Sequence, residues 1–141
     1  MDREILSIVL IFVFLLLLTV VFYLNNSSKI DNTLRKKLWD ELLQIKKMIE
    51  VQNPLTYRDI IIRLDSLLAR TLKLYYKNNE SCGTNLKRAK DLFEKEHYNK
   101  IWQAHKLRNK IVHENIEITS SELLQSYDTM RLAIKKLLYE K

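Results

Sequence analysis

A short segment in the last third of the chain carries most of the side chains that could do chemistry. Residues 102–114 read WQAHKLRNKIVHE and contain Arg108, Asn109 and His113, with His105 one turn earlier. On a helix, side chains four residues apart are offset by only about 40°, so His105, Asn109 and His113 line one stripe. An imidazole transfers protons near neutral pH, and a guanidinium binds phosphate and stabilises developing charge. The segment therefore suits phosphodiester chemistry.

The spacing of the arginine and the last histidine has a geometric consequence. On an ideal helix Arg108 and His113 lie about 140° apart, so they meet only if His113 leaves the helix or a second protomer completes the site. That geometry favours a dimer. The simpler alternative is an arginine that bonds a nearby carboxylate and a histidine that caps the helix C-terminus, where the helix dipole favours a cation.

Metal and nucleotide-cofactor sites are not expected. The three histidines, His97, His105 and His113, stand eight residues apart and form no i, i+4 pair of zinc ligands on a helix. The single cysteine, Cys82, excludes an intramolecular disulfide and a cysteine-rich zinc site. The single glycine, Gly83, excludes a Walker phosphate loop and a dinucleotide fingerprint. We therefore predict no metal and no cofactor.

The N-terminal part of the chain predicts a membrane anchor. An uncharged apolar run begins at Ile5 and ends at Leu24, and as a helix it would span roughly 30 Å, the thickness of a hydrocarbon core. The preceding MDRE is not basic and no small-residue cleavage site follows, which favours a transmembrane helix over a signal peptide. Basic residues follow the run, so we expect a single-pass inner-membrane protein with its N-terminus outside and its C-terminal domain in the cytoplasm.

The remainder of the chain predicts a helical bundle. The scarcity of Gly and Pro, one of each, disfavours β-hairpins. Apolar spacings of three and four predict helices over about 31–50, 57–76, 86–93, 98–112 and 119–137, with an irregular connection at 77–85. Thr56 with Asp59, and Thr119 with Glu122, match capping boxes. The expected fold is all-α: an anchor and linker (1–28), then an antiparallel bundle of four to five helices (29–141).

The charge balance points to anionic partners. The chain has 24 Lys and Arg against 17 Asp and Glu, a net charge of +7 at pH 7, and nearly all of these residues follow position 28. A basic domain suits nucleic acid or anionic lipid headgroups. A lysine-rich solvated surface explains the same charge without any partner.

The central segment resembles the signature of the HEPN superfamily. That signature is an arginine, usually followed by a polar residue, and then a histidine about four to six residues after the arginine. Arg108, Asn109 and His113 match it, late in a helical bundle and before a final helix. The similarity covers roughly residues 38–138. More closely, the chain resembles small bacterial proteins that carry one membrane helix before a HEPN-like domain, with an acidic residue in the second bundle helix, here Asp65.

The resemblance implies a four- to five-helix fold, a homodimer and, in catalytic members, metal-independent cleavage of RNA. The ribose 2′-hydroxyl would attack the phosphate, with His113 as general acid or base. Arg108 would stabilise the phosphorane-like charge and Asn109 would position the pair. His105 is more simply a packing or interface residue, and Asp65 a partner for a buried arginine or for the helix that carries the motif; both are also candidates for an auxiliary role. The partner would be RNA or a nucleotide. The alternative is a non-catalytic HEPN-like module that recruits a protein, a nucleotide or an anionic lipid at the membrane, and the sequence does not separate the two.

Overall fold

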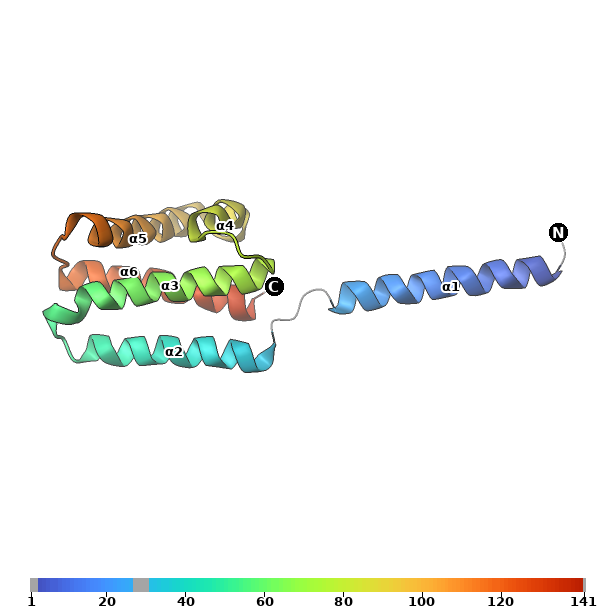
Figure 1. The fold of residues 1–141 in the computed structure, drawn as a ribbon, viewed down its shortest axis with the longest axis horizontal. Helices are drawn as coiled ribbons and strands as arrows, with labels where there is room; N and C mark the ends of the chain where they lie inside the picture. The colour runs from blue at the N-terminus through green and yellow to red at the C-terminus, as the bar shows by residue number, and fades with distance from the viewer. Residues whose placement is uncertain (1–2, 27–30, 141) are drawn as a thin grey trace. The chain divides into compact units, whose positions relative to one another are not determined.

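The computed structural model describes residues 3–26 and 31–140, and it divides into two compact units, Met1–Asp31 and Asn32–Lys141. The first unit contains helix α1 (Arg3–Asn26). The second contains the remaining helices (Figure 1). The boundary expected after residue 28 lies outside the described residues, within positions 27–30.

Helix α1 corrects the expected membrane anchor. Its described large apolar side chains are exposed, yet among the described residues no helix is long and apolar enough to cross a membrane. This finding contradicts the transmembrane helix predicted from Ile5 to Leu24 and the single-pass inner-membrane localisation.

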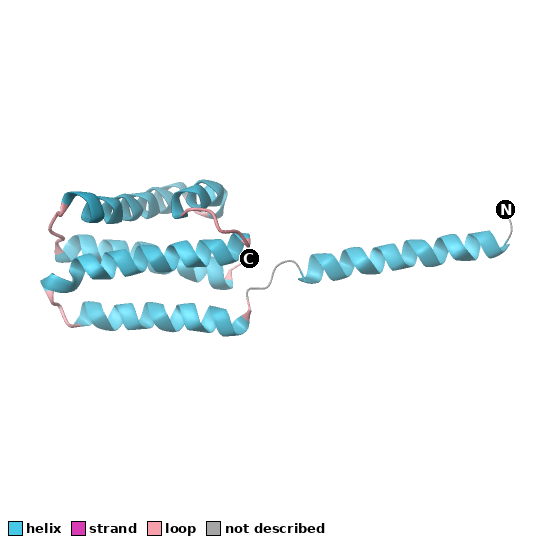
Figure 2. Ribbon diagram, in the orientation of Figure 1, coloured by secondary structure: helices cyan, strands magenta, loops and turns pink. Residues whose placement is uncertain are grey.

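The second unit is an all-α bundle, as the apolar spacing predicted. Four long helices form it: α2 (Asn32–Glu50), α3 (Tyr57–Tyr76), α5 (Lys95–Glu114) and α6 (Ser120–Tyr139). Each of α3, α5 and α6 runs antiparallel to the long helix before it in the chain, and the described backbone of this unit is helical apart from short connections (Figures 1 and 2). Helix α3 packs against α2, α5 and α6, so it is the central element.

The core follows from the apolar face of α3. Its Ile60, Ile61, Leu64, Leu67, Leu68 and Leu72 are fully inaccessible to solvent. Burial of one such side chain stabilises the fold by about 1.5–3 kcal/mol. The same helix also buries the carboxylate of Asp65, at 4% exposure, so a charged group is held rigidly inside an apolar helix face.

Two helices begin earlier in the chain than the sequence predicted. Helix α4 (Cys82–Arg88) occupies part of the segment expected to be irregular. It begins there because the Ser81 hydroxyl accepts a hydrogen bond from the Thr84 amide at 3.1 Å, which caps the helix. Helix α5 begins at Lys95, three residues before the expected start, after the short 3₁₀ helix η2 (Ala89–Leu92).

The two predicted capping boxes have different outcomes. Thr119 and Glu122 form one at the start of α6, with both reciprocal hydrogen bonds present. Thr56 makes no side-chain cap, because it ends the 3₁₀ helix η1 (Pro54–Thr56), and its hydroxyl donates to the Asn53 carbonyl. The prediction at Thr56 is therefore wrong.

The α6 capping box predicts an acid-dependent loss of stability. The backbone and hydroxyl hydrogen bonds from Thr119 lower the pKa of Glu122 below its ordinary value of 4.5. The stabilisation is complete above that value and is lost as pH falls through the lowered folded-state pKa. Because Gln also serves in a capping box, Glu122→Gln should keep the cap without this titration. Between about pH 5 and pH 3, the free energy of unfolding of wild type, measured in urea, should fall by roughly 0.5 kcal/mol more than that of the variant. Equal falls for the two proteins would contradict the assignment.

Candidate functional site

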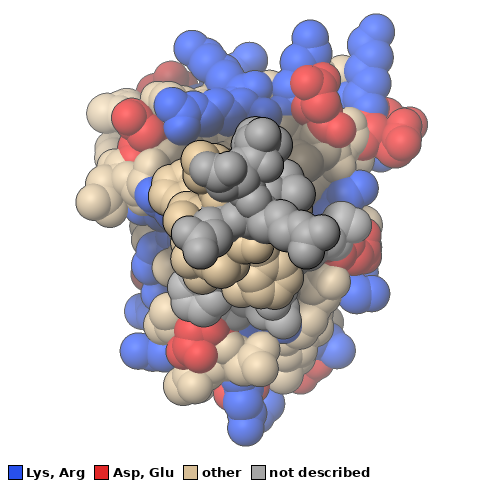
Figure 3. Space-filling model, turned by 90° about the vertical axis from the view of Figure 1, so that its right-hand side faces the viewer, with Lys and Arg blue, Asp and Glu red and all other residues tan. Residues whose placement is uncertain are grey.

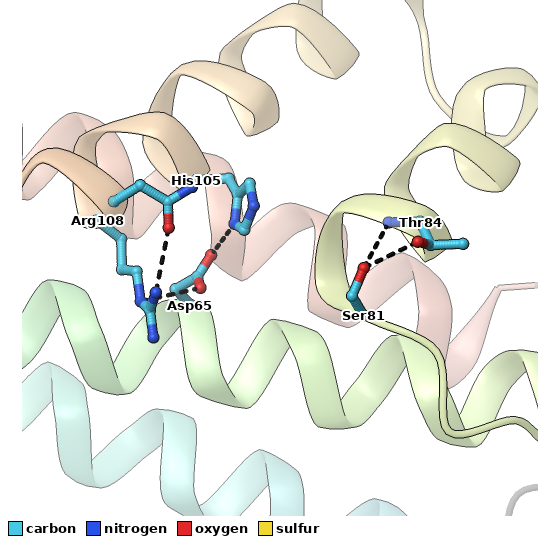
Figure 4. A network of polar contacts seen from close by, with 6 residues as sticks. Asp65, Ser81, Thr84, His105 and Arg108 are labelled. Atoms are coloured by element: carbon cyan, nitrogen blue, oxygen red, sulfur yellow. Dashed lines mark hydrogen bonds and ion pairs between the residues drawn. The ribbon is translucent and has the colours of Figure 1, made fainter. Parts of the chain in front are cut away.

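A buried carboxylate connects the two helices of the candidate site. Asp65 of α3 accepts a hydrogen bond at Oδ1 from Nδ1 of His105 on α5, over 2.7 Å. Its second oxygen, Oδ2, lies 3.5 Å from Nε of Arg108 (Figure 4). An ionised carboxylate only accepts hydrogen bonds, so this contact places the proton on Nδ1 of His105. One buried group thereby fixes the orientation of a histidine and an arginine.

Neighbouring side chains hold the guanidinium of Arg108 in place without engaging all of its hydrogen-bond donors. Nη1 donates to Oδ1 of Asn109 over 3.1 Å. Nε is buried and makes no hydrogen bond, so its 3.5 Å contact with Asp65 is a Coulombic attraction only. Within the described part of the chain no hydrogen bond engages Nη2, and the side chain is 35% exposed. Arg108 is therefore pre-oriented while it keeps donors for an anionic ligand.

Helix α4 adds a third group to the buried pair. The donor atoms of Asp65, Cys82 and His105 all lie within 4.8 Å of one another. Burial, and then the nearby Asp65 charge, raises the pKa of the Cys82 thiol to about 12, against an opposing effect of Arg108. The thiol is therefore protonated at neutral pH and is a poor nucleophile there.

The structure does not bring His113 to Arg108 within one chain. His113 is exposed in the last turn of α5, and the helix continues through Glu114. Among the described residues, no hydrogen bond or ion pair joins His113 to Arg108 or Asp65. Since His113 stays helical, the other route to a joint site is a second copy of the chain.

The end of α5 that carries His113 is fixed from α3. Arg58 donates from Nη2 to the carbonyl of Ile111 over 3.0 Å, and from Nη1 to Oδ1 of Asn115. Asn115 ends the helix in the left-handed conformation, with φ 49°. These bonds satisfy a terminal helix carbonyl and fix the end of α5. They therefore fix the position from which the exposed side chain of His113 projects.

A groove with a basic wall lies between α5 and α6. It has a volume of about 310 Å³ and is lined by Lys100, Lys106 and Lys110 of α5 and by Glu122 of α6, among others. Lys106, Lys110 and His113 are exposed, and their i, i+4 and i, i+3 spacings place them along one side of α5. The exposed histidine therefore borders this basic strip rather than the Asp65 cluster.

Of the predicted residues, the structure groups Asp65, His105, Arg108 and Asn109 and leaves His113 apart. Sequence reasoning missed Cys82 as a neighbour of that group. No spacing pattern could have found it, because a separate short helix delivers its sulfur. The roles assigned to these residues stay predictions.

The fold and this cluster define a class of protein: an all-α bundle with a buried carboxylate that binds a histidine and an arginine across two helices. Comparison of the chain with models of protein families, with curated proteins and with solved structures found no match.

Proposed function

We propose that this chain acts on RNA as a HEPN-like homodimer, in which Arg108 of one copy and His113 of the other form a metal-independent phosphodiester site. The observation that carries the proposal is the pre-oriented, partly exposed guanidinium of Arg108. A preorganised cation needs no rearrangement when charge develops on a phosphate, which is the main source of catalysis in phosphoryl chemistry. The resemblance to the HEPN signature supports the same residues.

The proposed reaction needs one proton carrier and one charge-stabilising group. The ribose 2′-hydroxyl attacks the adjacent phosphate, and His113 takes or gives the proton as general base or acid. Arg108 binds the phosphate oxygens through its free donors, and Asn109 keeps the guanidinium in place. His105 and Asp65 are auxiliary, because they hold the helix and the arginine rather than face solvent.

Surface charge supports RNA as the partner. Exposed Lys106 and Lys110 precede His113 along the same side of α5 and suit contacts with the phosphate backbone. In Figure 3, Lys and Arg side chains lie on several sides of the visible face with acidic side chains between them. The sign of the net charge therefore favours a polyanion, while any specific site has to come from a local strip such as the one on α5.

A non-catalytic binding module is the second candidate. The separation of His113 from Arg108 in one chain favours it, because a single chain then lacks a complete acid–base site. Such a module would use Arg108 and the lysines of α5 to hold RNA or a nucleotide without cutting it. Alternatively, the same all-α surface would recruit a protein partner.

The test is an RNA cleavage assay with the purified full chain in buffer without divalent metal. Wild type should cut, and His113→Ala should lower the rate by about 100-fold or more while RNA binding persists. His97→Gln is the matched control, because His97 contacts the Thr129 carbonyl at 3.0 Å and lies outside the site. Intact RNA after incubation with folded wild-type dimer, or unchanged cutting by His113→Ala, would overturn the enzyme proposal. RNA binding without cutting would favour the second candidate.

A further inference from the structure

Three side chains that can coordinate a metal ion come together from three separate helices. Asp65 comes from α3, Cys82 from the start of α4 and His105 from α5, and their donor atoms lie within 4.8 Å of one another. Asp65 is 4% exposed and the other two are partly buried. The meeting does not arise from local sequence, because each residue belongs to a different element of the bundle.

The chemistry of the set matches one class of ligand. A thiolate, an imidazole and a carboxylate together suit a borderline-soft divalent cation such as Zn²⁺. In a tetrahedral zinc site, bonds of about 2.0–2.3 Å place neighbouring donor atoms about 3.3–3.7 Å apart. The hydrogen bond between Asp65 and His105, at 2.7 Å, is shorter than that spacing, and all three donor atoms lie within 4.8 Å of one another. Coordination therefore requires side-chain rotations that bring the three donors to that spacing.

We propose that Asp65, Cys82 and His105 bind a zinc-class divalent cation, with water in the fourth position, and that the cation cross-links α3, α4 and α5. The site is separate from the proposed reaction, because neither Arg108 nor His113 is a ligand. It is connected to Arg108 through Asp65, whose Oδ1 faces His105 and whose Oδ2 faces the guanidinium. Asp65 can therefore coordinate with one oxygen and keep Arg108 with the other.

The exchange of protons and charge balances without any other reactant. On binding, the Cys82 thiol releases one proton to solvent and its sulfur forms the bond to the metal. The imidazole of His105 keeps one proton, on whichever ring nitrogen does not bind the metal. Two negative ligands then neutralise the divalent charge, and Arg108 retains the positive charge that it already has beside Asp65.

Cobalt(II) provides a direct test, because it adopts zinc geometry and is coloured. Titration of the metal-free full chain with Co²⁺ should produce a near-ultraviolet thiolate-to-cobalt band that saturates at one ion per chain, and Zn²⁺ should abolish it. Cys82→Ser should remove the band, since this chain has no other thiol. His105→Gln should weaken Co²⁺ binding by at least about tenfold.

The control and the contrary outcome are both independent of RNA cleavage. His97→Gln removes a histidine from the same helix without touching the cluster, and it should leave the cobalt band unchanged. A wild-type chain that remains folded by circular dichroism and gives no thiolate-to-cobalt band would overturn the proposal, whatever the variants do. A band that persists with equal affinity in His105→Gln would overturn it as well.

Discussion

Replacing Asp65 with alanine is expected to lower the free energy of unfolding by about 3 kcal/mol, near the low end for the loss of one partner of a buried ion pair. The carboxylate is 4% exposed and interacts with both His105 and Arg108. Its removal leaves the partly buried Nδ1–H of His105 without an acceptor and the buried Nε–H of Arg108 without a counter-charge. The effect stays near 3 kcal/mol because Arg108 is 35% exposed and can turn partly to solvent.

Urea unfolding of the full chain, followed by circular dichroism, measures this change. The matched control is Asp59→Ala on the same helix, which removes an exposed pair with Arg63 and should cost at most about 0.5 kcal/mol. Asp65→Asn should fall between the two, because the amide oxygen can still accept from His105 while the charge beside Arg108 is gone. Equal stabilities for the Asp65 and Asp59 variants would show that the buried cluster does not support the fold.

The apolar spacing was sufficient to predict the bundle because four long amphipathic helices have few ways to bury their stripes. The helix ends were predicted less well, since they depend on hydrogen bonds rather than on hydrophobicity. Ser81 starts α4 inside a segment rich in polar residues. Thr56 fails to cap α3 because Pro54 begins a 3₁₀ turn just before it. The predicted transmembrane helix was wrong, because among the described residues no helix is long and apolar enough to cross a membrane.

The site could be predicted only where it lies along one helix. The stripe of α5 was visible in the spacing of His105, Asn109 and His113, and so was the separation of Arg108 from His113. Asp65 contacts this helix and its arginine, which is the simplest role that the sequence suggested for it. Cys82 could not be placed, because its position depends on how the short helix α4 packs against α3 and α5. Tertiary packing, which no local pattern records, decides which distant residues share a cluster.

A mixed dimer should recover activity that both of its parent variants have lost. Arg108→Ala and His113→Ala homodimers each lack one half of every joint site, so each should cut RNA at least about 100-fold more slowly than wild type. When the two chains are co-expressed with different tags and purified through both, each dimer combines an intact Arg108 with an intact His113 across one of its two equivalent sites. This heterodimer should regain about half of the wild-type rate.

The alternative arrangement makes the opposite prediction. If Arg108 and His113 worked together within one chain, the heterodimer would contain no complete site and would stay as inactive as its parents. A dimer of a wild-type chain with a chain that carries both substitutions separates the cases further. A site within one chain would leave the wild-type partner active, at about half the rate. Joint sites across the interface would leave no complete site and therefore no activity. The extended α5, which keeps His113 helical and away from Arg108, is the reason to expect recovery in the first experiment and complete loss in the second.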